Sequence, residues 1–176
     1  MGSGPKQIVD RNCKGLMDLM LKTILVIVLI LIVYQDMKMR LIHILLPVAL
    51  FGLGMVMNWF FVDYAYMEWL WSLLFLGLNF LVVTLYFSVK KRSYTNPIDT
   101  LIGWGDVLFL IALIPFFSFR GYLQFFVMGM IFSLLLFVVM KAIYPKYRTI
   151  PLAGFLALFL MGTMLVDGVT DIDLLL

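Results

Sequence analysis

Two aspartates stand at the edges of long apolar segments, where a carboxylate is costly unless it meets water, a partner or a substrate. Asp36 follows an apolar run that ends at Gln35. Asp106 opens another run, directly behind the two glycines of the sequence GWGD, Gly103 and Gly105. Two carboxylates that approach within a few ångströms cannot both ionise easily, so one keeps a proton while the other stays anionic. Such a pair can hydrolyse a peptide bond by general acid–base catalysis of attack by water.

The composition decides what surrounds these aspartates. Of the 176 residues, 64% are hydrophobic and only 13% are charged, whereas a soluble domain is nearer half apolar with about a quarter charged. The sequence therefore predicts an all-α integral membrane protein. The single cysteine, Cys13, excludes a disulfide framework within the chain and a cysteine-rich zinc site. We expect no metal and no cofactor.

Six apolar segments are long enough, or nearly so, to cross a bilayer as helices. They cover residues 16–35, 41–61, 69–89, 106–119, 122–144 and 150–166. The fourth is short and is expected to extend backward through the glycines as less regular backbone. Residues 16–166 then form one six-helix membrane domain. Residues 1–15 are an N-terminal extension, either an interfacial helix or a cloning remnant, and residues 167–176 are an acidic tail.

The charges of the connecting loops predict an orientation. Basic residues gather in the first, third and fifth loops: Lys38 and Arg40, then Lys90, Lys91 and Arg92, then Lys141, Lys146 and Arg148. The positive-inside rule places these loops in the cytoplasm and both termini outside. The basic N-terminal stretch opposes this assignment, and the three internal loops outvote it. The membrane is then the cytoplasmic (inner) membrane of the cell.

The orientation brings the two aspartates to one side. The first helix runs inward and ends at Asp36, and the fourth runs outward and begins at Asp106, so both lie at the cytoplasmic face. Gly103 and Gly105 leave the backbone before Asp106 unshielded, and an extended substrate could bind there. Close packing of helices through small residues is the alternative interpretation of these glycines.

Three motifs, in order, resemble one family. The GWGD of residues 103–106 matches the GxGD motif of the type IV prepilin peptidases and the related preflagellin peptidases. The sequence DMKMRLI of residues 36–42 looks like that family's first aspartate segment. IPLAGFLA of residues 150–157 resembles the proline-containing entry to its last helix. The sequence departs from the family where His43 and Ile44 replace a Pro-Asn pair and where Leu108 replaces a lysine.

The resemblance implies a GxGD-type aspartic endopeptidase of the compact six-helix form. Its catalytic residues would be Asp36 and Asp106, and its partner would be a prepilin-like membrane protein with a basic leader peptide, cut at the cytoplasmic face. Gly103, Gly105, Lys38 and Arg40 would support the motif or bind substrate. Some family members also methylate the new N-terminus. We expect no such activity here, because neither a nucleotide-binding motif nor the family's cysteine-bearing domain is visible. No nucleic-acid partner is expected.

Three alternatives remain open at this stage. A presenilin-like or signal-peptide-peptidase-like protease shares the GxGD motif, but such proteins are larger and their first aspartate lies deeper in a helix. A small ion-coupled transporter would use the two aspartates as ion or proton sites near the bilayer midplane. A structural subunit of a secretion assembly would leave the paired acids unexplained. The only histidine, His43, lacks the partners that a catalytic or metal role needs.

Overall fold

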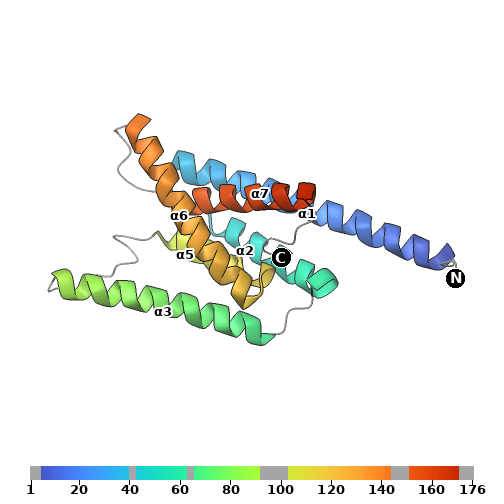
Figure 1. The fold of residues 1–176 in the computed structure, drawn as a ribbon, viewed down its shortest axis with the longest axis horizontal. Coiled ribbons are helices and arrows are strands. Elements are labelled where there is room, and N and C mark those ends of the chain that lie inside the picture. The colour runs from blue at the N-terminus through green and yellow to red at the C-terminus, as the bar shows by residue number, and fades with distance from the viewer. Residues whose placement is uncertain (1–4, 40–42, 63–65, 92–102, 144–150, 171–176) are drawn as a thin grey trace.

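The computed structural model describes residues 5–39, 43–62, 66–91, 103–143 and 151–170 (Figure 1). All regular structure in these ranges is helical. The α-helices are α1 (Pro5–Met39), α2 (Leu45–Met57), α3 (Tyr66–Lys91), α5 (Trp104–Ala112), α6 (Phe119–Ile143) and α7 (Leu152–Thr170). A π-helical turn, Asn58–Val62, continues α2, and a 3₁₀ turn, Ile114–Phe116, follows α5.

Three of the described helices are long and apolar enough to cross a membrane. The qualifying stretches are Gly15–Lys38, Tyr66–Tyr86 and Phe119–Ile143. Three shorter apolar stretches accompany them: Leu45–Phe60, Trp104–Phe116 and Leu152–Leu165. The predicted all-α class is therefore confirmed for the described residues, with six α-helices at the six predicted places. Three of the six expected spans reach full membrane length within these ranges.

Three helix ends differ clearly from the predicted boundaries. α1 begins at Pro5, so residues 5–15 continue the first helix and do not form a separate element. Proline is well tolerated in the first turn because the N–H it lacks has no partner there. α5 ends early, where Pro115 turns the chain into a 3₁₀ turn. α7 reaches Thr170, so the first residues of the expected acidic tail are helical, and residues 171–176 lie outside the described part.

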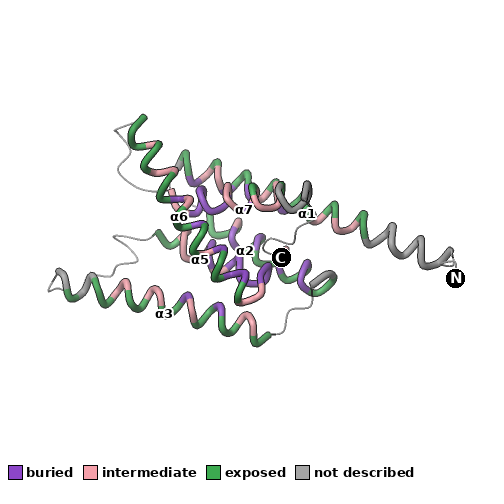
Figure 2. The backbone as a smooth tube through the Cα atoms, viewed as in Figure 1, coloured by how far each residue is buried: buried purple, intermediate pink, exposed green. Residues whose placement is uncertain are grey.

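A small core lies where α1, α2, α5, α6 and α7 meet (Figure 2). α7 packs along α1 in the opposite direction, α6 crosses α7, and α5 with α2 lies beneath them (Figure 1). The fully buried side chains include Leu29, Ile32, Phe109, Leu113, Phe125 and Leu156. Tyr122 is also buried, and its hydroxyl donates to the Leu110 carbonyl at 3.0 Å. This packing fixes α1, α5 and α7 relative to one another.

The outer surface of the bundle is apolar, as a bilayer environment requires. α3 lies at one edge and packs mainly against α6 (Figure 1). Large apolar side chains are exposed along it, among them Leu70, Trp71, Leu74, Leu78, Val82 and Leu85. Monomeric soluble proteins rarely expose such a continuous apolar surface. The exposed faces and the three long apolar helices are compatible with a membrane protein.

Candidate active site

The two aspartates meet at the N-terminus of α7. The backbone N–H of Ala153 donates to Oδ1 of Asp106 at 2.9 Å. The next N–H along the chain, that of Gly154, donates to Oδ2 of Asp36 at 2.6 Å. α1 contributes Asp36 near its C-terminal end and α5 contributes Asp106 in its first turn. The predicted convergence of these two side chains at one end of the bundle is therefore present.

The start of α7 has a local reason to attract carboxylates. The first N–H groups of a helix have no partner within the helix, and the helix dipole makes this end positive. A serine, threonine, asparagine or aspartate usually supplies an oxygen from the N-cap position. Here that position is Pro151, whose carbonyl accepts the Phe155 N–H but whose side chain has no acceptor. The N–H groups of Ala153 and Gly154 are therefore left for acceptors on other helices.

Asp36 is the more enclosed of the two carboxylates. It lies on the face of α1 that carries the buried Leu29 and Ile32, and only 6% of its surface is exposed. Gly154 makes this burial possible, because a Cβ atom at that position would lie 3.0 Å from Oδ2 of Asp36 and 3.4 Å from its Cβ. The glycine brings the α7 backbone close enough to hydrogen-bond the buried carboxylate.

Asp106 is more open. It sits in the first turn of α5, and Gly103 precedes that turn in an extended conformation with φ −65° and ψ 140°. Any residue adopts these angles, and a Cβ at Gly103 would make ordinary contact with Oδ2 of Asp106 at 3.5 Å. The Gly103 backbone also hydrogen-bonds the Asp106 carboxylate, as a capping-box residue reaches back to the N-cap. The backbone angles at position 103 therefore do not require a glycine. The lack of a side chain there leaves space beside Asp106. Gly105 follows inside the turn and is half-buried.

The geometry of α7 limits the separation of the two carboxylates. Neighbouring backbone nitrogens in an α-helix are roughly 3 Å apart, so the two bonded oxygens lie at most about 8.5 Å from each other. The two carboxylates are therefore held near each other by consecutive N–H groups of one helix.

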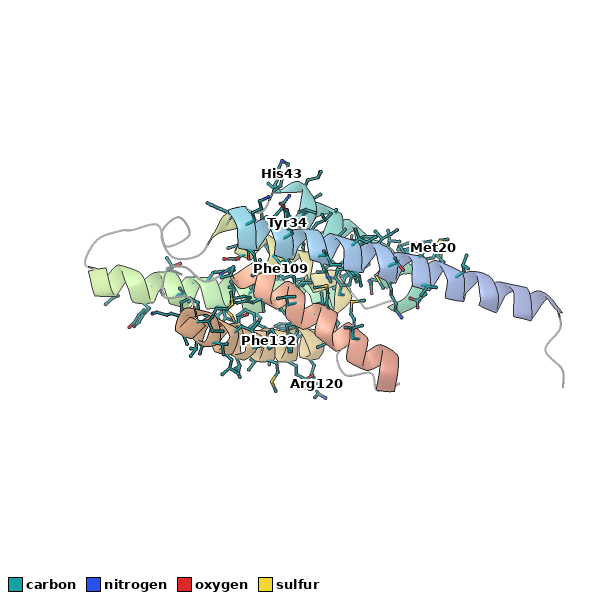
Figure 3. The ribbon with its side chains drawn as sticks, turned by 90° about the horizontal axis from the view of Figure 1, so that it is seen from above. Met20, Tyr34, His43, Phe109, Arg120 and Phe132 are labelled. Atoms are coloured by element: carbon teal, nitrogen blue, oxygen red, sulfur yellow. The ribbon has the colours of Figure 1, made fainter. Side chains whose placement is uncertain are left out.

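The expected supporting residues are only partly in place. The Lys38 ammonium donates to the Tyr34 hydroxyl at 2.6 Å and lies over the Tyr34 ring. Arg40 lies outside the described residues. His43 is exposed and points away from the molecule (Figure 3), where its Nδ1 accepts the Leu45 N–H at 3.4 Å. Among the described residues, no three histidine, cysteine, aspartate or glutamate side chains cluster to hold a metal.

Sequence reasoning missed the groups that hold the carboxylates. They are the backbone N–H groups of Ala153 and Gly154. A backbone donor cannot be recognised from the type of side chain at its position. A usable signal existed in the same segment: a helix start with proline at the cap and no polar residue from 150 to 157 must find its acceptors elsewhere.

No family model, curated protein or solved structure matches this chain.

Proposed function

We propose that this chain is a membrane-embedded aspartic endopeptidase of the prepilin-peptidase type. It cuts the basic leader peptide from a prepilin-like membrane protein. The observation that carries the proposal is the convergence of Asp36 and Asp106 on two consecutive N–H groups of α7. A locally capped helix start takes an acceptor from its N-cap side chain, whereas here both acceptors are carboxylates from two other helices.

The pair performs the chemistry with a water molecule held between the free oxygens. The anionic carboxylate takes a proton from the water, whose oxygen forms a bond to the scissile carbonyl carbon. The protonated carboxyl donates its proton to the carbonyl oxygen, giving a neutral tetrahedral diol. When the C–N bond breaks, the leaving amine receives a proton from the pair, and the diol loses one as it becomes the new carboxyl group. The α7 N-terminus keeps both carboxylates in position throughout.

In this proposal all six described α-helices cross or enter the cytoplasmic membrane. The ends of α1 and α6 and the starts of α5 and α7 face the cytoplasm, in accordance with the basic loops. Asp36 stands near the end of the candidate span Gly15–Lys38, and Asp106 stands in the first turn of α5. This interfacial depth suits a bond at the junction between a basic leader and an apolar helix. A transporter or a presenilin-like protease would instead place its acids deeper in the bilayer.

The test is cleavage of a purified prepilin-like protein in liposomes, followed by mass spectrometry. Asp36→Asn and Asp106→Asn are the informative variants, because asparagine keeps an oxygen for the α7 N–H groups and removes the acid–base function. Asp18→Asn is the matched control, since Asp18 lies on α1 eighteen residues before Asp36 and pairs with Lys22 at 2.8 Å.

The expected result is a substrate shortened by its leader with the unaltered chain and with Asp18→Asn, and intact substrate with either site variant. Each variant must elute as a folded monodisperse species. The two-aspartate mechanism is wrong if either folded site variant retains near-normal cleavage. If the unaltered chain leaves a panel of prepilin-like substrates intact, the transporter interpretation becomes the stronger one.

A further inference from the structure

A groove on the outer side of α1 and α7 joins an apolar wall to a cation. Its volume is about 580 Å³, within the range of sites that hold small organic ligands. Tyr34 and Lys38 line it together with five apolar side chains: Ile30, Val33 and Met37 of α1 and Leu158 and Met161 of α7. Tyr34 lies on the exposed face of α1 (Figure 3). The groove is therefore open to whatever surrounds the bundle.

The polar and apolar parts of the groove are separated along its length. On α1 it runs from Ile30 to Lys38, about 12 Å along the helix axis. α7 runs antiparallel to α1 (Figure 1), so Met161 lies toward the Ile30 end. The candidate span of α1 finishes at Lys38, which puts the ammonium at the level of lipid headgroups and the apolar wall at the level of acyl chains.

The chemistry of the polar end specifies an anion. The Lys38 ammonium uses one N–H on the Tyr34 hydroxyl, which leaves further donors on the ammonium and the hydroxyl hydrogen of Tyr34 itself. The end thus offers several donors and a positive charge to a group that carries several oxygen acceptors. An apolar helix in the groove would leave that charge facing hydrocarbon, whereas a phosphate would satisfy it.

We propose that the groove binds an anionic phospholipid of the surrounding bilayer. One acyl chain lies along the wall from Met37 to Ile30 and Met161, and the phosphate contacts the Lys38 ammonium and the Tyr34 hydroxyl. This site is independent of the peptidase activity, because it uses a different face of α1 from the one that carries Asp36.

Native mass spectrometry of the purified full chain tests the proposal, with dioleoylphosphatidylglycerol and dioleoylphosphatidylcholine as probes. The unaltered chain should bind the anionic lipid at least about fivefold more tightly, the effect of roughly one interfacial charge. Lys38→Gln should remove that preference and Lys38→Arg should keep it. Tyr34→Phe, which keeps the ring, should reduce it. Met161→Trp, which fills the apolar part of the groove, should weaken the binding of both lipids.

Lys141 provides the matched control. It stands in the last turn of α6, with its ammonium 5.8 Å from the centre of the Phe137 ring, and it lines none of this groove. Lys141→Gln should leave the preference unchanged. Equal binding of the two lipids by the unaltered chain overturns the proposal. So does an equal loss of preference in Lys141→Gln, which would indicate a general surface charge effect, and so does unchanged lipid binding in Met161→Trp.

Discussion

The N-termini of α6 and α7 meet the same physical need in different ways. At α6 the N-cap residue Ser118 accepts the Gly121 N–H at 3.2 Å, and one carboxylate, Glu68 of α3, accepts the Phe119 N–H at 2.8 Å. At α7 the N-cap residue is a proline, and two carboxylates from α1 and α5 accept consecutive N–H groups. α6 therefore shows what a structural cap in this protein requires: a local hydroxyl and one acid.

The difference is that a second carboxylate at α7 takes the place of the local hydroxyl at α6. Two carboxylates at one helix end repel each other, and each partly offsets the benefit that the other brings. A serine at position 151 would accept one of these N–H groups without that repulsion. The arrangement at α7 therefore carries an electrostatic cost that α6 avoids, and the proposed catalysis by a carboxylate pair would account for that cost.

The largest expected effect is a loss of activity in variants at the start of α7 that does not occur in a variant at the start of α6. Asp36→Asn or Asp106→Asn should lower kcat/KM by roughly 10³-fold, and the double variant should be hardly slower than either single one, because the pair acts as a unit. Glu68→Gln should cleave normally. Steady-state cleavage kinetics of the four variants decides this. If the loss of kcat/KM in the double variant equals the product of the two single-variant losses, the aspartates act independently.

A smaller effect concerns the close approach of α7 to Asp36. Gly154→Ala places a methyl group 3.0 Å from the Asp36 carboxylate and should slow kcat by about tenfold to a hundredfold through misplacement of that group. Gly162→Ala, on the same helix with nothing within 4 Å of its Cβ position, should retain full activity. Both are measured as kcat at saturating substrate. Equal activity in the two alanine variants would show that Asp36 tolerates the shift.

A third change makes α7 resemble α6. Pro151→Ser supplies a local hydroxyl at the N-cap, where it competes with the aspartates for the first N–H groups of the helix. Activity should fall several-fold while thermal stability stays the same or rises. Parallel cleavage and thermal-unfolding measurements distinguish this from simple damage, because a damaged helix start would lower both quantities together.

The smallest effect belongs to α6. Ser118→Ala or Glu68→Ala should each lower the free energy of unfolding by about 1 kcal/mol, the usual contribution of a helix cap, with little change in kcat. Unfolding in mixed micelles of increasing denaturing detergent measures this. A large loss of activity in Glu68→Ala at unchanged stability would contradict the structural role given to the α6 cap.

The elements and the meeting of the aspartates could be predicted because both follow from hydrophobicity and charge. Apolar length located the helices, and the alternation of basic loops put Asp36 and Asp106 at one end. The exact ends of the helices were harder to predict from the sequence. α1 extends back to Pro5 through polar residues that an apolar-length criterion ignores, and α5 is cut short by Pro115.

The details of the site depended on contacts that no local pattern encodes. Lys38 was expected to support the aspartate motif or bind substrate, and it stands two residues after Asp36 on the helix, so the two side chains face different directions. Its ammonium instead reaches Tyr34, one turn back. The role of Gly154 arises only when α1 and α7 pack together, since its neighbour in space lies far away in the sequence.

The order of synthesis separates the two aspartates from the N–H groups that hold them, because the proline at the start of α7 offers that helix no local cap. A ribosome releases α1 and α5, with both carboxylates, before it makes residues 151–154. Until α7 enters the bundle, Asp36 and Asp106 lack the N–H groups that position them, and α7 has no acceptor of its own at its first turn. Assembly of the site is thus coupled to integration of α7, and a nascent chain that stops short of this helix carries both acids without the N–H groups that bring them together.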